Sequence, residues 1–102
     1  MDYFYKKERD PSVSKFFDKE VLDAWSKFNS RVFGEGKLSK KEKELIAVAC
    51  TYLTRCPYCI EAHTKKALKE GATKEEIAEA IAIAAALAAG ATLAHMNFAL
   101  DV

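Results

Sequence analysis

Two similar capping signals divide this chain of 102 residues into helices. Ser39-Lys-Lys-Glu42 and Thr73-Lys-Glu-Glu76 each place a hydroxyl three residues before a carboxylate, which is the arrangement that satisfies the unpaired amides at a helix start. An apolar run with side chains three and four residues apart follows each signal. The residues after Leu53 show no strand-like alternation, β-branched enrichment or hairpin turn. The sequence therefore predicts an all-α fold of about five helices.

An apolar stripe marks the first predicted helix, which Pro11-Ser12 opens and Gly34 and Gly36 end. Spacings of four, four, three and four residues put its side chains on one helical face. Large apolar side chains in such a pattern usually face a core, so we expect a core face and not a ligand site. The stripe consists of Phe17, Val21, Trp25, Phe28 and Val32.

Proline and glycine set the remaining helix boundaries. Pro57 disfavours helical geometry at Cys56 and suits the first position of a new helix, so a third helix is predicted to begin there. Gly71 is predicted to end this helix, and Gly90 to end the fourth. A fifth segment, or a continuation of the fourth, reaches Leu100.

The stretch from Ala80 to Leu100 carries no Asp, Glu, Lys or Arg and is long enough to span a bilayer. Ten of its positions are alanine, polar residues lie towards its end, and no Lys or Arg follows it, which argues against a membrane helix. A helix that is apolar on all sides is normally buried, and so small a monomer cannot readily bury a helix of this length on all sides. We therefore expect a homo-oligomer whose interface uses these helices.

Composition restricts the possible partners. The formal net charge is +1 and the charged residues are scattered, so no basic block is available to neutralise nucleic-acid phosphates. The first twelve residues have no apolar run after their charges, so secretion is not predicted. Three cysteines, two of them close together, are typical of a redox or metal pair. We expect one domain over 1–102 with its motif-bearing part at 38–100, located in the cytoplasm, with neither nucleic acid nor a membrane as partner.

The chemistry is predicted to centre on Cys56-Pro-Tyr-Cys59. Two cysteines at i and i+3 across a helix start can form a disulfide, and the unpaired amides there favour the thiolate. His63 lies one turn beyond Cys59 on the same helical face and can take its proton. Glu44, on the preceding helix, reaches the third helix if the two pack antiparallel. A carboxylate in that position orients the imidazole and stabilises its charged form.

Three other interpretations use the same cysteines. A glutaredoxin-like domain carries the same tetrapeptide between a strand and a helix, but no sheet is predicted here. Structural zinc needs four ligands: the motif supplies three, with Cys50, His95 or Glu44 as a fourth, yet no second pair at finger spacing occurs. The third interpretation is an oligomeric helical scaffold in which the cysteines have no chemical role. Cys50 lies in an apolar run and is expected to be buried, and His95 is expected to be a core or interface residue.

The full pattern of Glu44, eleven residues, Cys56-Pro-Tyr-Cys59, three residues and His63 resembles the AhpD-like alkylhydroperoxidases of the carboxymuconolactone decarboxylase superfamily. The flanking runs LSKKEKELIAVA and GATKEEIAEAIAIAAALAAGA agree, so the resemblance covers about 38–100. It implies an all-helical trimer or hexamer that reduces organic hydroperoxides or hydrogen peroxide with its dithiol. Well-known members carry a histidine directly before the second cysteine, where this chain has Tyr58.

The resemblance also implies a role for each motif residue. Carried over by position, Cys59 is the thiolate that attacks the peroxide, Cys56 is the resolving thiol, and Glu44 and His63 form a proton relay. No metal or organic cofactor is required, and a lipoyl or thioredoxin-like protein supplies the electrons. The rival activity in this superfamily, decarboxylation of a carboxylated lactone, has no use for a dithiol.

Overall fold

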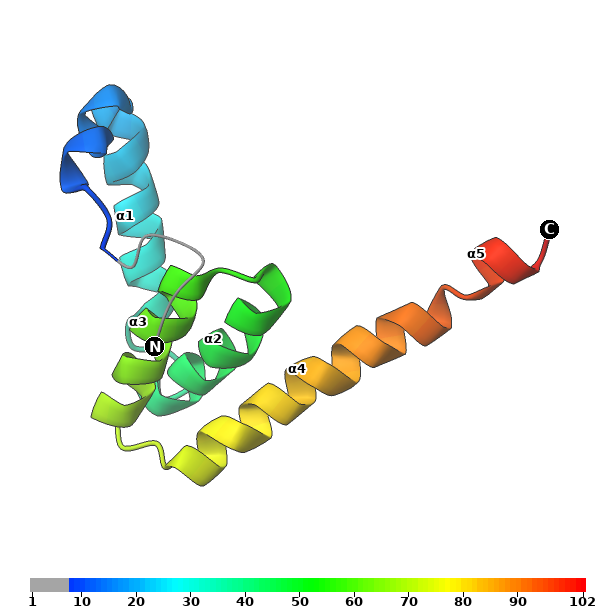
Figure 1. Cartoon of the computed structure of the whole chain (residues 1–102). Helices are drawn as coiled ribbons and strands as arrows, with labels where there is room; N and C mark the ends of the chain where they lie inside the picture. The colour runs from blue at the N-terminus through cyan, green and yellow to red at the C-terminus, as the bar shows by residue number, and fades with distance from the viewer. Residues whose placement is uncertain (1–7) are drawn as a thin grey trace. The chain divides into compact units, whose positions relative to one another are not determined.

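A computed structural model describes residues 8–102 (Figure 1), and all regular structure in this range is helical, which confirms the all-α prediction. The chain divides into two compact units, 1–36 and 37–102, and the second contains the motif-bearing part. The elements are a 3-10 helix, η1 (Pro11–Phe16), and five α-helices, α1 (Lys19–Phe33), α2 (Lys40–Thr54), α3 (Pro57–Lys69), α4 (Lys74–Ala94) and α5 (Asn97–Leu100).

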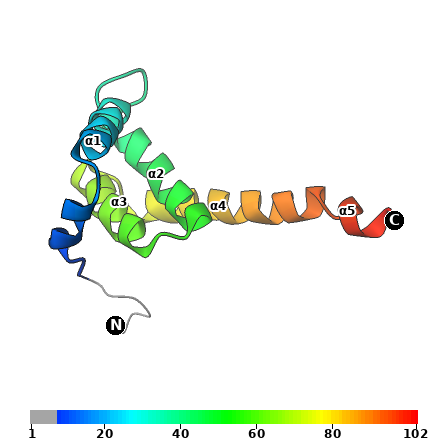
Figure 2. The same ribbon diagram turned by 90° about the horizontal axis from the view of Figure 1, so that it is seen from above.

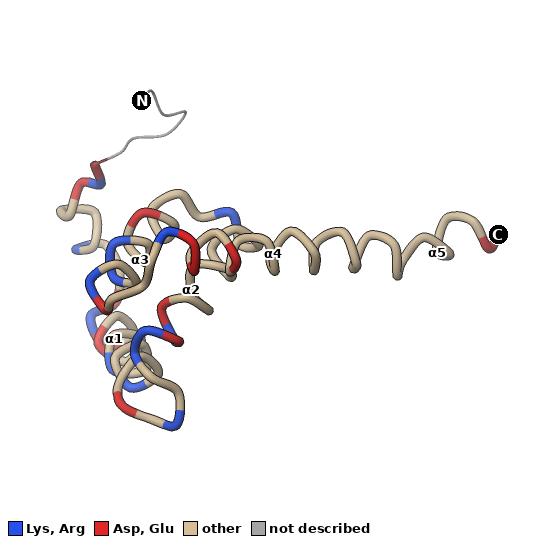
Figure 3. Tube along the Cα trace, turned by 90° about the horizontal axis from the view of Figure 1, so that it is seen from below, with Lys and Arg blue, Asp and Glu red and all other residues tan. Residues whose placement is uncertain are grey.

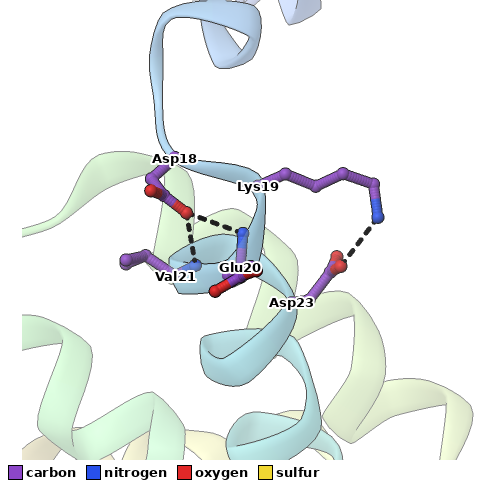
Figure 4. Close-up of polar contacts among 5 residues, drawn as sticks. All are labelled: Asp18, Lys19, Glu20, Val21 and Asp23. Carbon is purple, nitrogen blue, oxygen red and sulfur yellow. Dashed lines mark hydrogen bonds and ion pairs between the residues drawn. The ribbon is translucent and has the colours of Figure 1, made fainter.

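In the described part of the first unit, η1 precedes α1, and α1 starts later than the sequence predicts. Pro11-Ser12 opens η1 and not α1, because Phe17 is extended and Asp18 provides a separate N-cap. The Asp18 carboxylate accepts hydrogen bonds from the backbone N–H groups of Glu20 (2.8 Å) and Val21 (3.3 Å), as Figure 4 shows. This is the usual N-cap arrangement, in which a side-chain oxygen replaces the missing helical acceptor.

The apolar stripe of α1 is not covered by any other element of the first unit. No residue from 8 to 36 is buried, and Trp25 and Phe28 are 60% and 67% exposed. The prediction of a core face is therefore wrong within the first unit. A core needs two packed layers of secondary structure, and one α-helix with a six-residue 3-10 helix cannot enclose one.

The second unit is built on α2, which packs against α3 and against the first half of α4 (Figures 1 and 2). Val48 is fully buried at the centre of the contact, with Ala67 from α3 and Ile77 from α4 beside it. Small side chains let the three helices approach closely. The core is therefore compact but contains few large residues.

Because Val48 is the largest fully buried side chain, Val48→Ala is expected to lower the free energy of unfolding by about 2 kcal/mol. Urea denaturation followed by circular dichroism measures this loss. The matched control is Val13→Ala, since Val13 is 62% exposed and its loss should cost under about 0.5 kcal/mol. Equal losses in both variants would mean that Val48 does not anchor the core.

Both capping boxes form as predicted. The Ser39 hydroxyl accepts from the Glu42 N–H (3.0 Å) and the Glu42 carboxylate accepts from the Ser39 N–H (2.9 Å); Thr73 and Glu76 repeat the pattern. The hydrogen bond from the Ser39 backbone lowers the pKa of Glu42. The Lys41 side chain contacts Glu76 at 2.7 Å and lowers its pKa. This ion pair also ties the start of α2 to the start of α4.

The fourth helix runs past Gly90 to Ala94, so the predicted boundary at Gly90 is wrong. A glycine inside a helix costs only about 1 kcal/mol relative to alanine, and its neighbours here are alanines. The second half of α4 extends beyond α2 and α3 (Figures 1 and 2). By length and composition alone, the helical stretch 74–100 is capable of crossing a membrane. It contains an 18-residue window with a mean hydropathy of 1.9, and 11% of that window is buried.

Candidate functional site

The two cysteines lie at a tight junction between α2 and α3. Arg55, the C-cap of α2, has φ 58° and ψ 45°, in the left-handed region. This turn lets the Thr51 carbonyl accept from the N–H groups of both Arg55 (2.9 Å) and Cys56 (3.3 Å). Cys56 is then the N-cap of α3, and Pro57 is its first residue, as predicted. The chain therefore reverses within two residues and presents both sulfurs at the start of α3.

Cys56 and Cys59 are joined by a disulfide, with their Cα atoms 5.2 Å apart. The Cys59 N–H donates to the Cys56 Sγ at 3.2 Å, so this sulfur occupies the position of an N-cap oxygen. Helix amides in this position favour a negative charge on sulfur. The sequence predicts that the amides at the helix start act on both thiols, and in the structure Cys56 receives the direct hydrogen bond.

Glu44 and His63 meet across the α2–α3 contact. The Glu44 Oε2 lies 2.7 Å from the His63 Nδ1, although the residues are 19 positions apart in the chain. Glu44 is only 7% exposed, and a buried carboxylate is costly unless it is hydrogen-bonded. An ionised Glu44 accepts from Nδ1–H, which leaves the His63 Nε2 as the nitrogen that can take a proton.

The antiparallel packing of α2 and α3 thus brings all four predicted site residues to one helical hairpin. His63 lies one turn after Cys59 on the same side of α3, and Glu44 reaches it from α2. Both ring and carboxylate are largely shielded from water, at 19% and 10% side-chain exposure. The Glu44 carboxylate therefore contacts the imidazole of His63, one helical turn after Cys59. Within 8–102, no group of three or more His, Cys, Asp and Glu side chains is placed to bind a metal ion.

One further expectation fails. Cys50 is exposed and not buried, because it lines an open groove between α2 and α4. Of the two places predicted for His95, a core or an interface, the core is ruled out within the chain because the residue is exposed. Its Nδ1 contacts the Ala91 carbonyl at 2.8 Å, and its ring stacks on Phe98 with centroids 5.5 Å apart.

A groove that the sequence did not predict lies between α2 and α4, with a volume of about 390 Å³. The feature of the sequence that could have indicated this groove is a second set of apolar residues on α2, on a different face from the one that contacts α3. The groove is lined by Leu45, Ile46, Ala49, Cys50 and Leu53 of α2 and by Glu76, Glu79, Ala80, Ile83, Ala84 and Leu87 of α4.

The sequence pattern of the Carboxymuconolactone decarboxylase family matches residues 19–101, which is most of the chain. The chain belongs to the carboxymuconolactone decarboxylase family. An uncharacterised protein of the cox locus of Paracoccus denitrificans is 52% identical over 82 residues, covering 80% of this chain and 74% of that protein. Alkyl hydroperoxide reductase AhpD of Rhodospirillum centenum is 32% identical over 76 residues, covering 74% of this chain. This family member spans only 41% of that enzyme's length.

Solved structures support the same assignment of the fold. A protein from Methanobacterium thermoautotrophicum matches with a TM-score of 0.72 and 41% identity, over 76% of this chain and 90% of the other. A protein from Thermotoga maritima matches with a TM-score of 0.69 and 27% identity, over 90% of this chain and 86% of the other. The all-helical fold of this family member is therefore shared with experimentally determined structures.

Proposed function

We propose that this family member is a thiol peroxidase that reduces hydroperoxides with its Cys56–Cys59 dithiol. The observation that carries the proposal is the 2.7 Å contact between Glu44 and His63, one helical turn from Cys59. A buried acid that orients an imidazole beside a thiol is the arrangement that activates a cysteine nucleophile. The similarity to AhpD proteins supports the same chemistry.

The proposed oxidation uses both sulfurs. His63 takes the Cys59 proton at Nε2, and the thiolate attacks the terminal peroxide oxygen. An S–O bond forms and the O–O bond breaks, so sulfur loses two electrons to the peroxide, and the leaving alkoxide takes a proton to become an alcohol. The Cys56 thiol then attacks the resulting sulfenic acid, which forms the disulfide and releases water.

The proposed reduction needs an external dithiol, for which a lipoyl or a thioredoxin-like protein is the expected carrier. One carrier thiolate attacks the Cys59 sulfur and Cys56 leaves as a thiolate. The hydrogen bond from the Cys59 N–H to the Cys56 Sγ favours this direction, because it stabilises charge on the leaving sulfur. The second carrier thiol then releases Cys59, and the carrier departs as a disulfide. No step requires a metal or an organic cofactor.

A steady-state assay tests the proposal. We expect the protein to consume tert-butyl hydroperoxide or hydrogen peroxide continuously with dihydrolipoamide or with reduced thioredoxin as donor. Turnover should depend on both donor and enzyme concentration. If reduced protein fails to react with either peroxide in a single-turnover experiment, the proposed function is wrong, whichever donor is used.

Two alternatives give different results in the same experiments. If the motif instead holds structural zinc, freshly purified protein contains stoichiometric zinc and loses its helicity on chelation. If the protein decarboxylates a lactone, as the family name suggests, that activity persists when both cysteines are replaced by serine. The cytoplasmic location remains a prediction from the cysteine content.

A further inference from the structure

Arg55 has an unusual backbone conformation at the junction that carries the disulfide. Among residues 8–102 it is the one non-glycine residue with a positive φ, 58°. The left-handed region costs free energy for a residue with a Cβ atom, so glycine is the common choice at a helix end. The end of α3 follows this rule, with Gly71 at φ 92°. Arginine gains nothing from such a turn, so the local backbone does not account for its presence.

The Arg55 side chain contributes no contact to the fold. Arg55 is exposed, and its guanidinium forms no hydrogen bond or ion pair with any residue from 8 to 102. Its backbone N–H donates to the Thr51 carbonyl at 2.9 Å, which almost any residue could do. Residues in unfavourable backbone conformations cluster at functional sites. Arg55 directly precedes Cys56, so the sulfurs of the disulfide are the groups on which its charge can act.

Arg55 is also the one charged residue in a long stretch of the α2–α3 hairpin. No other Asp, Glu, Lys or Arg lies between Glu44 and Glu61. Glu44 contacts His63 at 2.7 Å, and Glu61 contacts Lys65 at 3.0 Å. The nearest carboxylates along the chain on either side are therefore already engaged, and the positive charge at the junction is not offset from α2 or α3.

The acidic residues of α4 lie too far away to offset this charge. Figure 3 shows that α4 is uncharged beyond its beginning, and no acid follows Glu79 before Asp101. Glu76 contacts Lys41 at 2.7 Å, at the start of α2. Arg55 follows the other end of α2, about 20 Å from Lys41 at the rise of an α-helix. Physiological salt screens charges beyond about 8 Å, so these acids have little effect at the junction.

We propose that the Arg55 guanidinium stabilises the thiolate of Cys56 and so favours reduction of the Cys56–Cys59 disulfide. The Cα atoms of consecutive residues are about 3.8 Å apart, and the long arginine side chain can bring its charge close to the neighbouring sulfur. A nearby positive charge favours the charged form of a thiol. The inference rests on the proposed function, in which Cys56 is the sulfur that leaves when a carrier attacks Cys59.

The charge acts at a defined step of that reduction. The carrier thiolate forms a bond to the Cys59 sulfur as the disulfide breaks, and Cys56 leaves with both electrons of the broken bond. The Cys59 N–H, 3.2 Å from the Cys56 Sγ, and the Arg55 guanidinium then both face a negative sulfur. A thiol of lower pKa leaves faster. The second carrier thiol releases Cys59, so the carrier loses two electrons and the protein gains them.

Substitutions at position 55 separate the charge from the backbone conformation. Arg55→Lys keeps both, Arg55→Asn removes the charge in a residue that tolerates the left-handed region, and Arg55→Gly removes both the charge and the strain. The two neutral variants should lower the equilibrium constant for reduction by dihydrolipoamide by about three- to tenfold at about pH 8. Arg55→Lys should stay within about twofold of the wild type. Alkylation of the free thiols at equilibrium, followed by mass spectrometry, measures the constant.

Lys69→Gln is the matched control, because it also removes one exposed positive charge from α3. Lys69 lies about 15 Å from Cys59 along the helix, so its loss should leave the equilibrium constant unchanged. Circular dichroism should show equal helicity in all four variants.

The ionisation of Cys56 provides a second readout. In a Cys50→Ser/Cys59→Ser background, Cys56 is the one remaining thiol of the chain, and the pH dependence of its alkylation gives its pKa. Adding Arg55→Gly should lower the acid dissociation constant of Cys56 by about three- to tenfold. The difference should shrink in about 1 M salt, which screens an exposed charge.

Several results would overturn the inference. These are unchanged constants in both neutral variants, an equal loss in Arg55→Lys and Arg55→Gly, or a similar loss in Lys69→Gln. Slower reduction by a carrier protein, with the equilibrium constant and the Cys56 pKa unchanged, would assign Arg55 to carrier docking instead. None of these measurements uses peroxide. A protein that shows the charge effect but does not react with peroxide would therefore refute the proposed peroxidase and leave the role of Arg55 intact.

Discussion

Cys59→Ser is expected to abolish peroxide consumption, with a residual rate at the level of the uncatalysed reaction. A serine hydroxyl is not ionised by a neighbouring imidazole to a useful extent at neutral pH, and it forms no sulfenic acid. Single-turnover consumption of tert-butyl hydroperoxide by reduced protein measures the effect. The disulfide partner Cys56 remains in this variant at the N-cap of α3, so the fold should be retained.

Cys56→Ser is expected to behave differently, because only the resolving thiol is removed. The variant should consume one equivalent of peroxide and then stop, with a sulfenic acid on Cys59 that adds one oxygen to the protein mass. Cys50→Ser is the matched control and should turn over like the wild type, since this thiol lies outside the α2–α3 site. If instead Cys59→Ser gives the single turnover and Cys56→Ser is inactive, the two roles are reversed, with the N-capping sulfur as the nucleophile.

Glu44→Gln and His63→Gln are each expected to slow the reaction of Cys59 with peroxide by about 10²–10⁴-fold, the range for a lost acid–base group. Glutamine at 44 still accepts a hydrogen bond from the His63 Nδ1, but it no longer stabilises a positive imidazole. Glutamine at 63 removes the nitrogen that takes the proton. The two losses should not add in the double variant, because the residues act as one unit.

The pH dependence separates this role from a structural one. In both variants the rate should rise again towards alkaline pH, where the Cys59 thiol ionises without a base. Glu70→Gln is the control, since Glu70 is exposed at the end of α3 and its loss should leave the rate within about twofold. Wild-type rates in both relay variants, with intact helicity, would show that the assigned roles are wrong.

Local signals in the sequence predicted local structure well. The hydroxyl and carboxylate of each capping box act within four residues of chain, so the starts of α2 and α4 could be read directly. The Asp18 cap could have been recognised by the same rule, since an N-cap acid precedes the apolar run of α1. The predicted helix end at Gly90 was wrong because a single glycine does not outweigh the helical preference of the alanines around it.

Contacts between distant residues divide into two cases. The Glu44–His63 contact could be anticipated because two helices joined by a two-residue junction pack antiparallel, and this sets which residues face each other. The exposure of Cys50 and Trp25, by contrast, could not be anticipated from the sequence. Periodicity says which side chains share a face, but not whether anything in the same chain covers that face.

The position of the carboxylate has one more consequence. A synthetic peptide copied from α3 would carry both sulfurs and the imidazole, yet it would lack Glu44, which α2 supplies. Any reactivity that depends on the acid is then a property of the folded hairpin and not of the tetrapeptide. In a denaturant titration, the fast reaction with peroxide should disappear at the denaturant concentration at which α2 and α3 separate. The rate of that reaction would then report directly on whether the hairpin is folded.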